Sequence, residues 1–91
     1  MSAIGFIETS GRLGAIVATD VALKTANVRL LSLHKASGGL VTVIIQGDVA
    51  AVQVAIDTAQ VEAQLLCEYI TTNVIPKPAN DTISNIKMIS K

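Results

Sequence analysis

The spacing of apolar residues along this chain switches between a period of two, typical of strands, and a period of 3.6, typical of helices. Short runs rich in β-branched residues predict four strands, at residues 3–8, 28–35, 40–45 and 69–75. Apolar residues at helical spacing predict one helix from Leu13 to about Thr25 and a second from Asp48 to about Cys67. The first helix has its stripe at five positions: Leu13, Ile16, Val17, Val21 and Leu23. The predicted order is therefore β-α-β-β-α-β.

Polar residues, glycine and proline mark where these elements begin and end. Ser10 or Thr9 is expected to cap the first helix, and Asp48 to cap the second, because the first amide groups of a helix need an acceptor. Asn27 is a plausible left-handed terminator of the first helix. The last strand should stop at residues 76–78, Pro-Lys-Pro, since proline has no backbone N–H for the sheet.

This order predicts an α+β, ferredoxin-like fold, in which a four-stranded antiparallel sheet carries two helices on one face. The link Ser37-Gly38-Gly39 tolerates positive φ, so the second and third strands should form a hairpin. Residues 1–80 are predicted to form one domain, and residues 81–91 a tail with a possible helical turn around Thr82 to Ile86. The fold alone does not identify a function.

The composition points to a protein that associates with copies of itself. Of its 91 residues, 51% are apolar and only 15% are charged, yet a chain of this size buries only roughly 60–65% of its unfolded surface. Partner subunits are expected to cover the excess. Seven basic residues balance seven acidic ones, and this balance argues against a nucleic-acid partner. No signal peptide and no apolar run of membrane-spanning length is apparent, so the interpretation is a cytoplasmic protein without a membrane partner.

Candidate catalytic chemistry is sparse. The single cysteine, Cys67, excludes a disulfide framework, and no Cys/His cluster predicts a metal or cofactor. His34 is the single histidine, the residue type that changes charge near neutral pH, and it is interpreted here as a strand residue without a chemical role. No nucleophile motif accompanies the serines, so the chain is predicted not to be an enzyme.

Three segments carry a more specific signal than the fold does. They are residues 3–9 (AIGFIET), 38–49 (GGLVTVIIQGDV) and 74–78 (VIPKP), with KTANV at residues 24–28 between the first two. Together they closely resemble the bacterial microcompartment (BMC) domain, and more narrowly the single-domain hexameric shell proteins of carboxysomes and of the propanediol, ethanolamine and glycyl-radical metabolosomes. The resemblance covers about residues 3 to 80.

The resemblance implies a structural shell protein that forms a homohexamer with a narrow central pore. Because six glycine-rich turns would present backbone N–H groups to this opening, we expect it to pass small polar, often anionic, metabolites. Hexamers would tile into sheets with other shell proteins around encapsulated enzymes or their targeting peptides. Carried over from the family, the residues of the pore turn are Ala36, Ser37, Gly38 and Gly39. The residues of the hexamer edge are Lys24, Asn27 and Lys77.

The chain departs from the family pattern at three places. Many relatives have arginine where Gln46 stands, and arginine where Lys77 stands. Many also have Gly-Ser-Gly at the pore, where this chain has Ser37-Gly38-Gly39, so the hydroxyl that lines the pore is uncertain from sequence.

Three other functions remain open from the residues themselves. The main alternative is an oligomeric ferredoxin-like regulatory domain that binds a small ligand between subunits. An RNA-binding module would need exposed aromatic residues and a basic surface, but the aromatic residues are only Phe6 and Tyr69. An acyltransferase or isomerase of this fold would need a catalytic site that the sequence does not offer.

Overall fold

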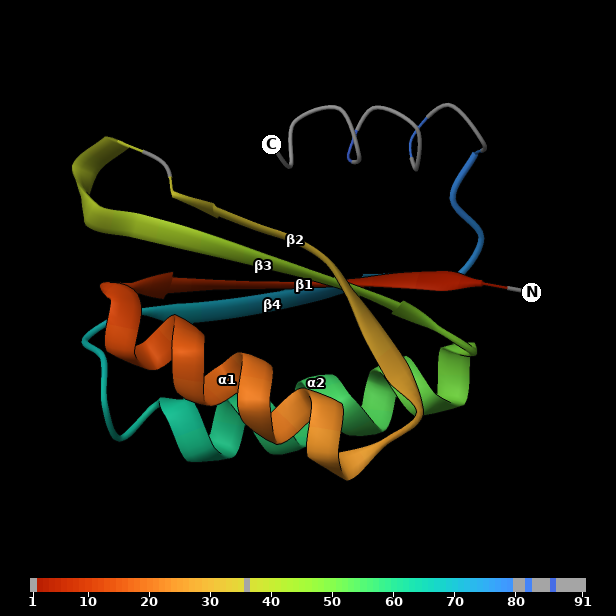
Figure 1. Cartoon of the computed structure of the whole chain (residues 1–91), viewed down its shortest axis with the longest axis horizontal. Helices are drawn as coiled ribbons and strands as arrows, with labels where there is room; N and C mark the ends of the chain where they lie inside the picture. The colour runs from red at the N-terminus through yellow and green to blue at the C-terminus, as the bar shows by residue number, and fades with distance from the viewer. Residues whose placement is uncertain (1, 36, 80–81, 83–85, 87–91) are drawn as a thin grey trace.

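Four strands and two helices follow one another in the predicted order (Figure 1). The computed structural model describes residues 2–35, 37–79, 82 and 86. The elements are β1 (Ala3–Ser10), α1 (Arg12–Thr25), β2 (Val28–Lys35), the 3-10 turn η1 (Ser37–Gly39), β3 (Leu40–Gly47), α2 (Val49–Ala63) and β4 (Ile70–Ile75).

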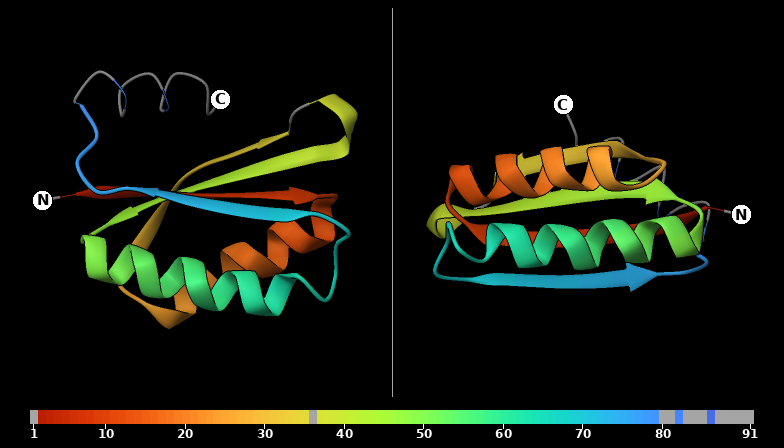
Figure 2. Two further views of the ribbon diagram at one scale, coloured as in Figure 1. Left: turned by 180° about the vertical axis from the view of Figure 1, so that it is seen from behind. Right: turned by 90° about the horizontal axis from the view of Figure 1, so that it is seen from below.

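The strands form one sheet in the order β2-β3-β1-β4, and every neighbouring pair is antiparallel. Both helices cover the same face of this sheet, α1 toward β2 and α2 toward β4 (Figure 2). The ferredoxin-like prediction is therefore confirmed. The opposite face, which we call the open face, carries no helix from the range 2–79, and β2 and β4 form the two edges of the sheet.

The core lies between the sheet and the helices and is built mainly of small and β-branched side chains. Ile7, Val43 and Ile45 project from the strands toward Val52 and Ile56 of α2, and all are almost fully buried. The buried alanines of the two helices are Ala15, Ala18, Ala22, Ala55, Ala59 and Ala63. Small side chains let each helix approach the sheet and the other helix closely, so the layers pack tightly.

Gly5 in β1 extends this close packing. A Cβ atom at this position would lie 2.8 Å from Cγ1 of Val52 and 3.0 Å from two side-chain atoms of Ile56. The absence of a side chain at Gly5 is therefore what lets α2 rest directly on the sheet.

The apolar stripe predicted for the first helix faces the core only in part, where the half-buried Val21 packs against the buried residues. Its large members are exposed: Leu13 by 59%, Ile16 by 57% and Leu23 by 42%. The buried face of α1 is instead the face that carries Gly14, Ala15, Ala18 and Ala22. The narrow space above the sheet admits these small residues, and the large aliphatic residues point outward.

The predicted start of the first helix was wrong in detail. β1 continues through Ser10, and Gly11 with φ 87° occupies the N-cap position of α1 without a side-chain hydrogen bond. Thr9 and Ser10 serve other contacts: Thr9 Oγ1 donates to the Gly11 carbonyl at 3.1 Å, and Ser10 Oγ accepts from the N–H of Tyr69 at 3.0 Å.

Asn27 is not a left-handed terminator either. α1 ends at Thr25, its C-cap residue Ala26 has extended backbone angles, and no described residue other than glycine has positive φ. The second helix ends at Ala63, four residues earlier than predicted, and residues 64–69 form an exposed connection in which Leu65 is 82% exposed. β3 runs two residues further than predicted, to Gly47, and β4 begins at Ile70.

The C-terminal tail is described only at Thr82 and Ile86, both helical, so the rest of the helical turn predicted there lies outside the described residues. Ile86 is buried on the open face, where it packs with Ile4 and Ile44. The division into a domain over residues 1–80 and a tail stays a prediction.

Candidate pore turn, ring edge and cationic pocket

The turn between β2 and β3 lies at one end of the molecule. Gly38 and Gly39 have φ of 78° and 80°, a conformation that L side chains rarely adopt. A Cβ atom on either glycine would meet nothing within 4 Å, so the turn projects into open space. The Gly39 carbonyl accepts a 2.8 Å hydrogen bond from the N–H of Gly11, which holds the turn against the start of α1. Ala36 and the side chain of Ser37 lie outside the described residues.

The three predicted edge residues lie at the other end of the molecule. Lys24 is in the last turn of α1, Asn27 stands just before β2, and Lys77 follows β4. All three are exposed. β2 and β4 run between the two ends, so the sheet separates these residues from the turn (Figure 1). The structure thus sorts the predicted site residues into two groups at opposite ends.

Lys24 already has a partner within the chain. Its ammonium lies 3.0 Å from a carboxylate oxygen of Asp20, one helical turn earlier, and the two side chains are 76% and 58% exposed. Such an exposed pair contributes only about 0–1 kcal/mol, so Lys24 is free to exchange it for another acceptor.

Asp48 occupies the N-cap position of α2, as predicted, but its side chain makes no capping hydrogen bond. Its backbone carbonyl accepts the first helical bond from the N–H of Val52 at 2.8 Å. The prediction was right about the position and wrong about the side-chain contact.

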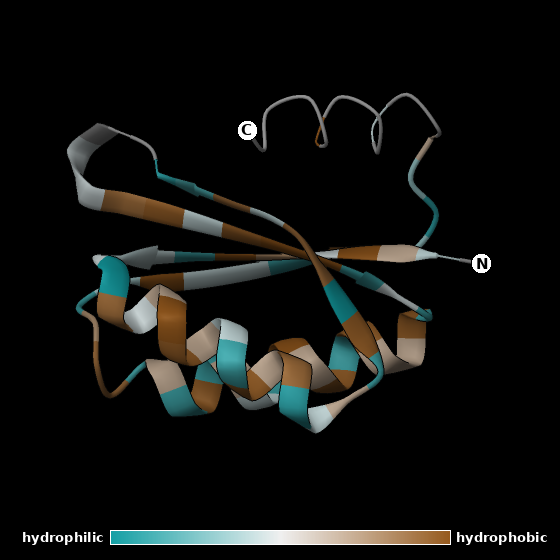
Figure 3. Ribbon diagram, in the orientation of Figure 1, coloured by the Kyte–Doolittle hydropathy of each residue, from teal (hydrophilic) through white to brown (hydrophobic). Residues whose placement is uncertain are grey.

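The two long sides of the molecule, one along α1 and β2 and the other along α2 and β4, differ in shape: the first has an apolar groove and the second has exposed apolar side chains. On the α1–β2 side a groove of about 220 Å³ runs between Ile16 and Leu33, above Ala15 and Val41. The exposed large apolar residues of α2 and of the connection to β4 are Val49, Val54, Val61, Leu65, Leu66 and Tyr69. Figure 3 shows apolar segments along both helices. These outward residues fit the expectation that partner subunits cover part of the surface.

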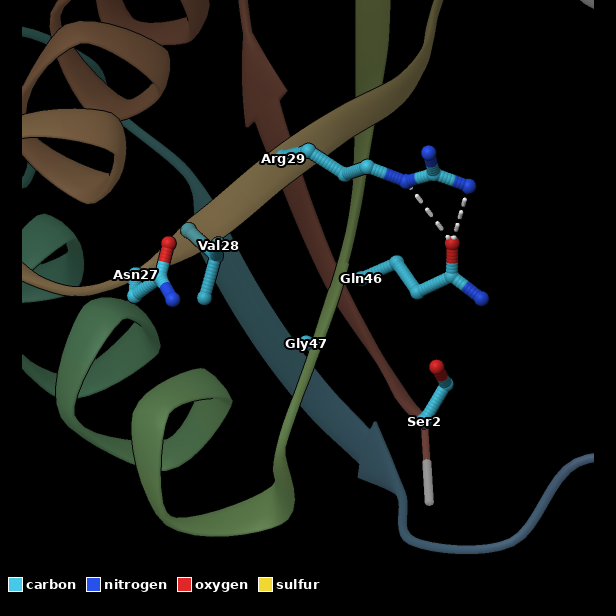
Figure 4. Close-up of a pocket in the computed structure, with 6 residues that line it drawn as sticks. All are labelled: Ser2, Asn27, Val28, Arg29, Gln46 and Gly47. Carbon is cyan, nitrogen blue, oxygen red and sulfur yellow. Dashed lines mark hydrogen bonds between the residues drawn. The ribbon is translucent and has the colours of Figure 1, made fainter.

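A cationic pocket lies near the end of the molecule that carries Lys24, Asn27 and Lys77. It is formed by Arg29, a residue that the sequence did not single out. Arg29 on β2 donates from Nε and Nη2 to Oε1 of Gln46 on β3, at 3.1 and 2.9 Å (Figure 4). The two residues are direct cross-strand partners. Counting residues back from the turn does not pair Arg29 with Gln46, because a β-bulge between Leu30 and Ser32 shifts the register by one residue.

The other polar residues that the structure describes form no catalytic cluster. His34 is exposed on the open face opposite Thr42, and Cys67 is half-buried with its Sγ 3.2 Å from the Ala63 carbonyl. Ser32 is buried without a hydrogen-bond partner for its hydroxyl. Within the described residues no three His, Cys, Asp or Glu side chains group to hold a metal ion. No helix in that part of the chain is long and apolar enough to span a membrane.

Comparison with known proteins points to one family. The family model for the BMC domain matches residues 3–78. The bacterial microcompartment shell protein EutM of Salmonella typhimurium is 41% identical over 81 residues, which cover 89% of this chain and 84% of EutM. The shell protein PduA of Citrobacter freundii is 44% identical over 79 residues, covering 87% and 85% of the two chains.

Two further similarities involve longer proteins. The carboxysome assembly protein CcmO of Synechococcus elongatus is 37% identical over 86 residues, which cover 94% of this chain but 31% of CcmO. The crystal structure of a microcompartment protein from Desulfitobacterium hafniense superposes with a TM-score of 0.86 at 28% identity. That match covers all of this chain and about half, 49%, of the solved one.

Proposed function

The chain belongs to the BMC domain family and is a structural shell protein of a bacterial microcompartment, not an enzyme; from this premise we propose that six copies close into a ring. In this ring the Gly38-Gly39 turn faces the axis, and the end that carries Lys24, Asn27 and Lys77 faces outward. Shell proteins of this family associate with other shell proteins, and the outward end is where neighbouring rings would meet.

The observation that carries the ring is the difference between the two long sides of the molecule. One side has the groove between Ile16 and Leu33, and the other has protruding apolar residues that include Leu65 and Tyr69. A contact between two different patches is head-to-tail, and it closes into a ring when the rotation between subunits fits.

Both patches reach the end of the molecule that carries the turn. The groove includes Arg12 and Lys35, next to the turn, and Tyr69 is hydrogen-bonded to Ser10 at the end of β1. A head-to-tail contact near this end would bring the turns of successive subunits close together, which supports their place at the axis.

A ring of these turns would offer a narrow opening lined by glycine backbone. Backbone N–H groups can bind anions and polar molecules without a charged side chain. We therefore propose that the opening passes small polar metabolites, anionic ones among them. Enzymes or their targeting peptides inside the shell are proposed as further partners.

The regulatory alternative would place a ligand between subunits of a small oligomer. The relatives favour the structural role, because the similar curated proteins are shell proteins over most of their length.

Light scattering followed by negative-stain electron microscopy tests this proposal. We expect a mass of six chains in solution and, at higher concentration, flat sheets or tubes of rings. A stable monomer or dimer at micromolar concentration would refute the ring and favour the regulatory alternative.

A further inference from the structure

We propose that the cationic pocket formed by Arg29 and Gln46 binds an oxyanion, either a carboxylate or a phosphate. The pocket has a volume of about 280 Å³ and is lined by Ser2, Asn27, Val28, Arg29, Gln46 and Gly47. The side chains of Arg29 and Gln46 project to the same side of the hairpin, and the Ser2 side chain points toward Gln46 (Figure 4).

The hydrogen bonds between Arg29 and Gln46 leave donors free on both side chains. Arginine has five N–H groups, of which two here bind the same oxygen, Oε1 of Gln46, so three remain for a ligand. With Oε1 engaged, the free polar atom of Gln46 is its amide nitrogen, which can only donate. The Gln46 side chain is held in place because the residue is only 8% exposed.

The positive charge of Arg29 has no partner within the described part of the chain, where the ion pair found is Lys24 with Asp20. No carboxylate lines the pocket, and Asp48, the residue after Gly47, forms no ion pair with Arg29. A fixed, planar guanidinium beside further donors suits a carboxylate or phosphate, because both can accept two parallel hydrogen bonds. A neutral ligand would leave the charge uncompensated, and a cation would be repelled.

The oxyanion could come from two sources. One is a free metabolite, and the other is an acidic side chain of a neighbouring ring, since Asn27 belongs to both the pocket and the proposed edge. Only the second source rests on the proposed function. Because the pocket is open to solvent, we expect a free ion to bind with a Kd on the order of 1 mM.

Equilibrium dialysis of the full-length protein against labelled inorganic phosphate and labelled succinate tests the site. Arg29→Met removes the guanidinium from an exposed position and should fold. Gln46→Glu supplies an internal carboxylate that occupies the guanidinium. Arg12→Met is the matched control for ion binding, because Arg12 is an exposed arginine outside the pocket; since Arg12 also lines the groove of the proposed ring contact, it is not used as a control for assembly. We expect both pocket variants to lower the affinity at least 10-fold, Arg29→Lys to lower it several-fold, and the control to stay within twofold.

Sheet formation in electron micrographs tests whether the oxyanion is an acidic side chain of a neighbouring ring. Sheets lost in Arg29→Met and Gln46→Glu at an unchanged ring mass of six chains, without binding of a free ion, would assign the oxyanion to a neighbouring ring. Unchanged ion binding and unchanged sheets in Arg29→Met would overturn the proposal, as would an equal loss of ion binding in Arg12→Met. Binding that does not saturate in any variant would mean an adventitious ion only. Ring mass is measured separately by light scattering. A failure to form rings would therefore refute the proposed function, while the dialysis would still show whether the pocket binds an oxyanion.

Discussion

Replacing Gly5 with alanine is expected to push α2 away from the sheet. The added Cβ would lie 2.8 Å from Cγ1 of Val52 and 3.0 Å from Ile56, whereas carbon atoms pack best at about 3.5–4.0 Å. Both neighbours are almost fully buried, so neither can move freely. Overpacking of this kind costs about 1–3 kcal/mol.

An opposing effect acts on the unfolded chain. Gly5 does not have positive φ, so alanine fits its backbone conformation and reduces the entropy of the unfolded state by about 0.4–1 kcal/mol. The steric cost is the larger of the two. We therefore expect Gly5→Ala to lower the free energy of unfolding by about 1–2 kcal/mol.

Urea unfolding followed by far-UV circular dichroism measures this change, since the chain has no tryptophan. Protein concentrations must be matched, because association stabilises the folded subunit. Val52→Ala removes the nearest methyl group and should cost about 2 kcal/mol by itself. The loss of unfolding free energy in the double variant should be smaller than the sum of the two single losses by about 1 kcal/mol, because the alanine at position 5 then no longer collides with Cγ1 of Val52. If Gly5→Ala were as stable as the parent, or the two losses simply added, the close approach of α2 would not exist.

Three further substitutions test other parts of the molecule. Lys24→Ala should leave the ring mass in light scattering unchanged but abolish sheets in electron micrographs; sheets that persist in this variant would remove Lys24 from the edge. Gly38→Leu should reduce the passage of small anions through assembled shells while rings persist, and it should add about 1–2 kcal/mol of backbone strain at the φ of 78°. Gly38→Asn is the control, because asparagine tolerates that φ better. Unchanged passage in Gly38→Leu would argue against the pore. Ile86→Ser should lower the free energy of unfolding by about 2 kcal/mol, because this side chain is 7% exposed; an unchanged urea midpoint would mean that it does not stabilise the open face.

The sequence by itself determined the elements, their order and the hairpin. Periodicities of two and 3.6 reflect contacts between residues close in the chain, so they could be read without the fold. The Gly38-Gly39 pair predicted a turn because only glycine adopts positive φ without strain, and both residues do so here. The family resemblance rested on contiguous segments and was confirmed over residues 3–78.

Tertiary structure alone decided which surfaces face inward and which residues meet. The large residues of α1, such as Ile16, are exposed because only small side chains fit between this helix and its neighbours. Thr9 and Ser10 could not cap α1 because pairing with β3 and β4 extends β1 past the predicted boundary. Arg29 meets Gln46 through a register that includes a bulge. These outcomes depend on distances between segments far apart in the sequence, and no local pattern records such distances.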